Sequence, residues 1–320
     1  MQNAREEVIT FADLLVDAEV ERRKVNLETV CKYWIGILDR YMGWILPNEL
    51  VVVGADTWMG KSEIAYKIAV TNAHRGKKVL LFALEWDLNE VALRYMQRTI
   101  SELVPLKTID FRFNRKQEHS EYVDHIIKWL DKEEWVQNLL IFKKQQVPTM
   151  ELLASMIEQM KDWVDMIIID HLHYIQFGSA SQEIEEIGKV MRQVKQITDT
   201  IKKPIIIMSH LRKRKKADDP TEQDLYWSSN IAKEANTIIL LTRMENEHVE
   251  KLVDNWVQDD ARYAWTKIIV EKSRTGLAVP TKFSTVYDLD RKDYVDELSE
   301  IILNESRAKK SDALDAVKIW

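Results

Sequence analysis

The segment GADTWMGKS, at positions 54–62, limits the possible folds of this chain more than any other feature. An apolar run over 49–53 comes directly before it, and an amphipathic stretch that begins near Ser62 follows it. A strand, a loop and a helix in this order form a phosphate-binding loop, because backbone N–H groups and the helix N-terminus then point at phosphate oxygens. The segment therefore predicts an α/β fold that binds the phosphates of ATP.

Each polar residue of such a loop has a separate task. Lys61 would reach the β- and γ-phosphates, Ser62 would ligate Mg²⁺, and Gly60 would let the backbone approach closely. The usual pattern GxxxxGK[ST] has glycine where Ala55 stands, because Gly54 comes one residue too early. A chance Gly-Lys-Ser at the start of a helix is the alternative. The other loop residues expected around the phosphates are Asp56, Thr57, Trp58 and Met59.

Short apolar runs alternate with longer amphipathic stretches through the middle of the chain. This pattern is typical of a parallel sheet covered by helices on both faces. After the last parallel strand, the runs at 264–272 and 280–287 flank Thr275-Gly276, which predicts an antiparallel hairpin. Helices outside the sheet are expected at 8–25 and 298–320. The predicted parallel strands are 49–54, 78–84, 166–170, 204–209 and 237–242.

Composition limits the location and the partners of the chain. No apolar run approaches the roughly 20 residues that span a bilayer, and the first residues lack the pattern of a signal peptide, so we expect a cytoplasmic protein that binds no membrane. Cys31 is the single cysteine, which excludes an internal disulfide and a cysteine cluster for zinc. Because the net charge is -6, any contact with nucleic acid must use a local basic patch.

Two carboxylates end predicted strands near the phosphate loop. Asp170 ends MIIID and Glu85 ends LLFALE, and α/β sheets bind ligands at the carboxyl ends of their strands. Asp170 would hold Mg²⁺ directly or through water, and Glu85 would polarise the attacking water. Each carboxylate taken alone could equally be a solvated loop residue or a helix cap.

The strand at 204–209 leads into His210 and a dense basic loop. His210 could donate to a γ-phosphate oxygen and report hydrolysis to the loop; the alternative is a surface histidine with no task. The loop could contact nucleic-acid phosphates, or it could be a solvated charge run. Its cations are Arg212, Lys213, Arg214, Lys215 and Lys216.

Lys272 and Arg274 should lie on one face of the predicted hairpin, since side chains alternate along a strand. A hairpin at the far edge of the sheet cannot easily reach its own phosphate loop, so these cations would enter the site of an adjacent subunit. Exposed charges that discourage aggregation are the alternative. His171 and His173 are assigned no metal, because the sequence shows no third ligand near them.

Several of these segments resemble the RecA-like domain of hexameric replicative helicases, the DnaB family with its phage and Twinkle-type relatives, over about 46–288. ADTWMGKS is similar to that family's phosphate loop, in which alanine often comes first. FALEW resembles the strand with the catalytic glutamate, IIIDHLHYI the segment of the metal-binding aspartate, and MSHL the sensor motif. EKSRTG resembles the hairpin with the trans-acting lysine and arginine, and DNA loops are implied at 177–182 and within 224–243.

The resemblance implies an α/β fold: a RecA-like P-loop ATPase core with a mostly parallel central sheet, a terminal β-hairpin and flanking helices. We expect an N-terminal helical arm over 1–45, the ATPase domain over 46–295 and a C-terminal helical tail over 296–320. The expected function is that of an ATP-dependent DNA helicase or translocase, which uses ATP and Mg²⁺ and moves on single-stranded DNA as a homo-oligomeric, hexameric ring with possible replication partner proteins. Two alternatives stay open: a recombinase- or clock-type ATPase that unwinds nothing, and a regulatory or loader subunit that binds ATP.

Overall fold

The computed structural model describes the central part of the chain and short pieces near its start. None of the helices within these described ranges is long and apolar enough to cross a lipid bilayer. The described residues are 10–12, 15–16, 19–20, 30–56, 59–85, 87–93, 124–125, 127–142, 148–175, 183–212, 218–225, 228–244, 263–274, 277–288 and 293–302.

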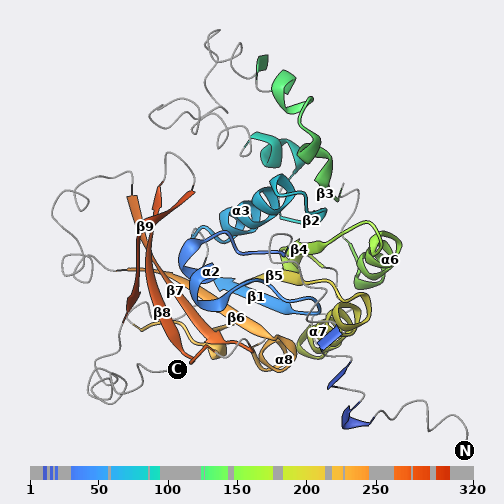
Figure 1. Cartoon of the computed structure of the whole chain (residues 1–320). Coiled ribbons are helices and arrows are strands. Elements are labelled where there is room, and N and C mark those ends of the chain that lie inside the picture. Colours follow the sequence, from blue (N-terminus) through green and yellow to red (C-terminus); the bar gives the residue numbers. More distant parts are fainter. Residues whose placement is uncertain are drawn as a thin grey trace, which may run out of the picture.

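A single mixed sheet runs through the described part of the molecule, with strand order β3-β2-β4-β5-β1-β6-β7-β8-β9 (Figure 1). The strands β3, β2, β4, β5, β1 and β6 are parallel to one another. The strands β7, β8 and β9 then continue the sheet, each antiparallel to the strand before it. The strands are β1 (Leu50–Ala55), β2 (Val79–Ala83), β3 (Leu139–Ile141), β4 (Met166–Asp170), β5 (Ile205–His210), β6 (Thr237–Arg243), β7 (Tyr263–Lys272), β8 (Thr281–Asp288) and β9 (Asp293–Ile302).

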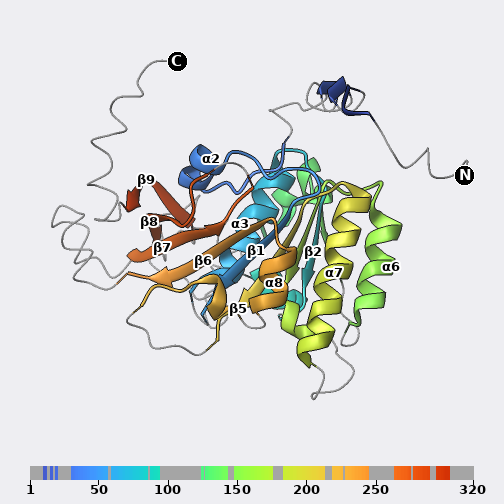
Figure 2. The same cartoon turned by 90° about the horizontal axis from the view of Figure 1, so that it is seen from below.

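Helices cover both faces of the parallel part of the sheet (Figure 2). Alternate residues of each strand enter opposite cores: Val51 and Val53 of β1 pack on the side of α2 (Gly36–Met42) and α3 (Lys61–His74), whereas Leu50 and Val52 pack on the other side. Strands buried on both faces explain why the sequence reads as near-continuous apolar runs. The second face is covered by α6 (Met150–Met160), α7 (Glu183–Ile201) and α8 (Ser228–Glu234). Short 3-10 helices are η2 (Glu134–Asn138), η3 (Leu172–Tyr174) and η5 (Glu222–Asp224).

The strand predictions are confirmed for the parallel strands β1, β2, β4, β5 and β6 and for the antiparallel pair β7 and β8. The helical tail predicted over 296–320 is wrong as far as residue 302, because these residues belong to β9, where Ile301 pairs with Phe283 of β8. The rest of that tail lies outside the described residues. Within 8–25, the described residues 11–12, 15–16 and 19–20 are helical.

The residues that precede β1 belong to the same core as the sheet. Tyr33 and Ile35 are fully buried with α2 against α3, and Cys31 forms an isolated antiparallel bridge with Ile45. Asn72 of α3 fixes this segment, since its side chain accepts from the backbone N–H of residue 32 at 3.1 Å and donates to that residue's carbonyl at 2.8 Å. The packed unit thus includes residues that the sequence alone assigns to the arm over 1–45.

Candidate nucleotide-binding site

The carboxyl ends of β2, β4, β5 and β1 lie side by side, and we call this side of the sheet the carboxyl edge. The side at which these strands begin is the amino edge. The strand register brings the predicted site residues together at the carboxyl edge, because Ala55 pairs with His210 and Ala83 pairs with Asp170. Glu85 follows directly, and its backbone N–H donates to the carbonyl of Asp170 at 3.4 Å.

The phosphate loop leads from β1 into α3 at this edge. Gly60 takes a left-handed conformation, with φ of 77°, and among the described residues no atom beyond its chain neighbours and its own helix lies within 4 Å of the place where a Cβ would stand. This glycine is also the N-cap of α3 and provides no side-chain hydrogen bond to the first turn, so the helix presents backbone N–H groups to an anion. Ala55 is buried at the end of β1, and the backbone N–H of Met59 donates to the carbonyl of Asp56 at 3.4 Å. Thr57 and Trp58 lie outside the described residues.

The glycine that comes one position early in the motif has a packing role. A Cβ on Gly54 would stand 2.5 Å from Cδ2 of Leu225 and 2.8 Å from Cδ2 of Leu240. Because neighbouring side chains fill this space, Gly54 lets Leu225 close over β1. The packing of Gly54 agrees with a phosphate loop that begins at Ala55, which stays a prediction.

Lys61 is the charged centre of the site. Its side chain is 5% exposed, and its Nζ lies 3.2 Å from Nδ1 of His210. Burial lowers the pKa of Lys61 to about 8, although the negative charges of Asp170 and Glu85 act to raise it. Ser62, the next residue of α3, is buried as well. A buried ammonium at a helix N-terminus, with two carboxylates close enough to affect its pKa, is suited to bind a polyanion together with a cation.

Three histidines lie near this ammonium. The ring centroids of His171 and His210 lie 3.9 Å apart, and Nδ1 of His173 lies 2.9 Å from Nδ1 of His171. Burial and the nearby positive charge of Lys61 lower the pKa of His210 to about 4, while burial and His210 lower that of His173 to about 3. Burial also holds the pKa of His171 far below its usual value. At neutral pH all three rings are therefore uncharged.

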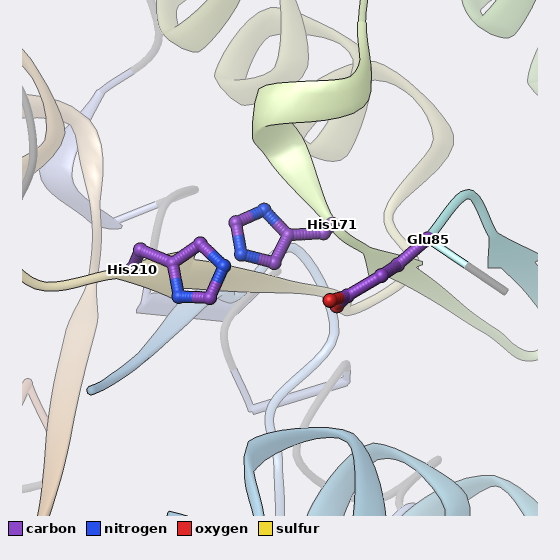
Figure 3. Close-up of side chains that lie close together, drawn as sticks. All are labelled: Glu85, His171 and His210. Atoms are coloured by element: carbon purple, nitrogen blue, oxygen red, sulfur yellow. The ribbon is translucent and has the colours of Figure 1, made fainter. Parts of the chain in front are cut away.

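The sequence alone gives His171 and His173 no third partner, and the structure corrects this. His210 and Glu85 come from β5 and from the end of β2, and potential ligand atoms of Glu85, His171 and His210 all lie within 4.8 Å of one another (Figure 3). Only the strand order β2-β4-β5 brings these residues together. The spacing of the histidines along the chain carries no such signal.

The model of the DnaB-like helicase C-terminal domain matches residues 34–290 of the chain. The chain belongs to this family. At 23% identity over 286 residues it is similar to the replicative DNA helicase DnaB of Helicobacter pylori (strain ATCC 700392 / 26695), and the match covers 85% of this chain and 56% of that protein. The DnaB helicase of Pasteurella multocida is 25% identical over 246 residues, which are 75% of this chain and 50% of the relative. The chain thus spans about half the length of these curated relatives.

Two solved structures have the same fold as this DnaB-like domain. One is a DnaB-like replicative helicase studied for its interactions with primase, which matches with a TM-score of 0.68 and 20% identity over 90% of this chain and 66% of that chain. The other is the ATPase domain of another protein, with a TM-score of 0.68 and 20% identity over 89% of this chain and 96% of that chain. The RecA-like α/β fold expected from the sequence is therefore confirmed.

In this DnaB-like domain, Lys272 and Arg274 lie far from the domain's own phosphate loop. Lys272 pairs with Ile238 near the start of β6, whereas Ala55 pairs with Leu241 near the end of β6. The two cations therefore stand at the amino edge. Nζ of Lys272 donates to the carbonyl of Ala232 at 2.6 Å, in the last turn of α8, and Arg274 is exposed.

The basic loop leaves the carboxyl edge directly after β5. Arg212 is exposed, and its backbone N–H donates to the carbonyl of Asp224 at 2.7 Å. The chain returns at Asp219, whose carboxylate accepts from Lys267 of β7 at 2.7 Å and from Lys282 of β8 at 2.8 Å. The sequence alone did not indicate this attachment of the loop to the antiparallel strands. The other cations of the loop, Lys213, Arg214, Lys215 and Lys216, and the segment 177–182 lie outside the described residues.

Proposed function

We propose that this chain is an ATP-dependent DNA translocase of the replicative-helicase type. The observation that supports this best is the placement of Lys61, whose buried ammonium lies at the uncapped N-terminus of α3 beside His210 and under the influence of Asp170 and Glu85. Membership in the DnaB-like family agrees with this assignment.

The residues at the carboxyl edge fit Mg²⁺ and a triphosphate. The Ser62 hydroxyl and the Asp170 carboxylate provide the hard oxygen ligands that Mg²⁺ prefers, and Lys61 with the first N–H groups of α3 provides donors for phosphate oxygens. Mg²⁺ would neutralise charge that develops on the phosphates during transfer. Ala55, Asp56, Thr57, Trp58, Met59 and Gly60 would complete the loop around the phosphates.

Nucleotide binding would change the partners of Lys61 and His210. In the structure the ammonium of Lys61 faces Nδ1 of His210. With a triphosphate in place, Lys61 would donate to phosphate oxygens and His210 would be released to contact the γ-phosphate. The exposed Glu85 would orient the water that attacks in line. The state of the γ-phosphate would then reach the basic loop through His210, which is two residues from Arg212.

The site would be completed by a neighbouring subunit. Lys272 and Arg274 stand at the amino edge, so they can serve a phosphate only in another copy of the chain. This arrangement supports a ring, which we propose to be hexameric, with the basic loop over 212–216 on single-stranded DNA and with replication proteins as possible partners. The cytoplasmic location stays a prediction.

ATP turnover by the purified chain tests this proposal. With Mg²⁺ present, single-stranded DNA should stimulate hydrolysis, and Lys61→Ala should reduce it by about a hundredfold or more, because removal of one donor to the developing charge has effects of this size. Lys189→Ala is the matched control, since this lysine is exposed on α7. Turnover that is absent with and without DNA would favour a regulatory or loader subunit.

Unwinding needs a separate measurement. We expect the chain to displace the labelled strand of a forked DNA in the presence of ATP, and we expect Glu85→Gln to bind nucleotide but to displace nothing. DNA-stimulated hydrolysis without strand displacement would instead support the recombinase- or clock-type ATPase.

A further inference from the structure

A compact group of metal-ligating side chains stands at the carboxyl edge, apart from the oxygen ligands expected for Mg²⁺. Glu85, His171 and His210 come from the ends of three adjacent strands, and potential ligand atoms of all three lie within 4.8 Å of one another. Figure 3 shows the two imidazole rings side by side, with the Glu85 carboxylate directed toward them. The exposed Glu85 leaves the group open to solvent on one side.

His171 has an unused ligating atom. The residue is fully buried, and its Nε2 has no hydrogen-bond partner among the described residues. Burying a polar nitrogen without a partner is costly, so such an atom calls for an explanation. The other ring nitrogen, Nδ1, lies 2.9 Å from Nδ1 of His173. This nitrogen of His171 also accepts from the backbone N–H of His173 at 3.2 Å, so both contacts with His173 fix the ring and only Nε2 is left for a ligand. Metal-bound histidines in proteins generally use one ring nitrogen for the metal and the other for a hydrogen bond that holds the ring in place.

The chemistry of this group differs from that of a magnesium site. Two imidazoles and one carboxylate are the ligands that zinc and similar transition metals prefer, whereas Mg²⁺ prefers oxygen ligands and its own waters. With metal–ligand bonds of about 2.1 Å, two ligand atoms can be at most about 4.2 Å apart. The three ligand atoms lie within 4.8 Å of one another, so they need to approach by only about 0.6 Å to meet this limit.

We propose that Glu85, His171 and His210 form a binding site for a transition metal ion of the zinc type, oriented by His173 and distinct from the Mg²⁺ that accompanies ATP. Water completes the coordination on the exposed side. Binding of this ion does not depend on the proposed ATPase activity. One consequence does rest on the proposed function: a bound ion occupies Glu85 and His210, so it inhibits hydrolysis.

Lys61 opposes the binding of this ion. Its Nζ lies 3.2 Å from Nδ1 of His210, so its ammonium repels a dication held by that ring. Removing the ammonium should therefore strengthen metal binding even though it removes ATP turnover. Lys61→Ala should thus raise the affinity for the metal and abolish ATP turnover. Because the two measurements change in opposite directions, a failure of the metal site can be distinguished from a failure of the proposed function.

The test is a titration of the untagged, nucleotide-free chain with Zn²⁺ in excess Mg²⁺, followed by competition with a chromophoric zinc chelator. We expect one ion per chain, and Co²⁺ in its place should give the visible absorption of a tetrahedral nitrogen and oxygen site. His171→Gln and Glu85→Gln should each weaken binding by at least about tenfold, as loss of supporting residues alone already does. Lys61→Ala should tighten it.

His125→Gln is the matched control, since His125 is exposed and stands outside the group. Its affinity for Zn²⁺ should equal that of the unchanged chain. If the buried His171→Gln variant does not fold, as judged by circular dichroism, the exposed Glu85→Gln variant still decides the question. Absence of stoichiometric binding, or equal affinity in the unchanged chain and in Glu85→Gln, would overturn the proposal.

Discussion

The carboxyl edge and the amino edge of the parallel strands both bury ionisable side chains, but they do so in different ways. At the amino edge, Glu49 is 3% exposed and its carboxylate accepts from the Thr237 hydroxyl and from the backbone N–H of residue 46, so its hydrogen bonds stay within the chain. At the carboxyl edge, Lys61 has a neutral imidazole as its near partner, beside a helix N-terminus without a side-chain cap. A buried carboxylate whose hydrogen bonds stay within the chain supports the fold, whereas a buried ammonium with remaining donors is available to a ligand.

The two edges are also complementary. The carboxyl edge gathers groups that suit phosphates and Mg²⁺, and the amino edge presents Lys272 and the exposed Arg274. Neither edge of one chain holds both sets. If the two edges complement each other in this way, each active site combines the carboxyl edge of one subunit with Lys272 and Arg274 of the next.

The largest expected effect tests this complementarity directly. Arg274→Ala should lower DNA-stimulated ATP turnover by about a thousandfold, the usual effect of an arginine that stabilises phosphoryl transfer from a second subunit. A mixture of Arg274→Ala and Lys61→Ala chains should recover part of the turnover, because some interfaces then join an intact Lys61 to an intact Arg274. Each variant is inactive alone, so its separate assay is the control. A mixture that stays inactive while the chains still assemble would show that Arg274 does not act across an interface.

A second prediction concerns how well the amino edge is closed. Cys31 is 6% exposed, with its thiol 3.8 Å from the carbonyl of Asp165 just before β4. Burial raises the pKa of this thiol from 9.0 to about 12. Since the thiolate is the reactive form, alkylation at pH 8 should be about a thousandfold slower in the folded chain than in urea. Thiol titration with a coloured reagent measures both rates, and similar rates would mean that this edge opens readily.

A third prediction concerns the tight packing of the carboxyl edge around β1. Gly54→Ala places a Cβ 2.5 Å from Cδ2 of Leu225, so we expect a loss of about 1–3 kcal/mol in the free energy of unfolding, measured with urea. Leu225→Ala alone creates a cavity and is also destabilising. The double variant should lose less free energy of unfolding than the two single variants together, because the alanine at position 225 makes room for the new methyl group at position 54. Additive losses would count against the close contact.

The smallest effect concerns the end of the basic loop at the carboxyl edge. Burial alone would raise the pKa of Asp219, but its hydrogen bonds with Lys267 and Lys282 and their charges outweigh this and lower it below 3.8. A lowered pKa means that the carboxylate adds stability above the unfolded value and loses this contribution as the pH falls through the folded value. Asp219→Asn should therefore reduce the free energy of unfolding at pH 7 by about 1 kcal/mol or less.

Urea denaturation of this variant and of the unchanged chain at pH 7 and near pH 3 provides the measurement. The difference between the two proteins should shrink at the lower pH. Asp199→Asn is a suitable control, because Asp199 is an exposed carboxylate that pairs with a single lysine, Lys195, within α7. An equal difference at both pH values would contradict the role of the two lysines.

The sequence predicts the parallel strands well because each is a short apolar run buried on both faces. It also predicts that Asp170, His210 and Lys61 meet, since the ends of parallel strands share one edge. Two strands escape detection for physical reasons. β3 is only 3 residues long and half-buried, and β9 contains Glu and Leu residues that favour a helix, so pairing with β8 overrides local preference.

Part of the site also depends on contacts between residues that lie far apart in the sequence. His171 and His173 look isolated in the sequence because His210 reaches them only through the order of the strands. The role of Gly54 likewise depends on Leu225, which closes over β1 from another part of the chain. Such contacts follow from tertiary packing, and no spacing rule within one segment predicts them.

The central position of β1 determines where movement can occur during a catalytic cycle. β1 is hydrogen-bonded to β5 on one side and β6 on the other, and all its residues are buried. Shifting the base of the phosphate loop would break two ladders at once, so this strand acts as a fixed reference for the molecule. In the translocase proposed above, the stroke would then come from parts attached to this reference at a distance, such as the returning loop held by Asp219 and the outer antiparallel strands.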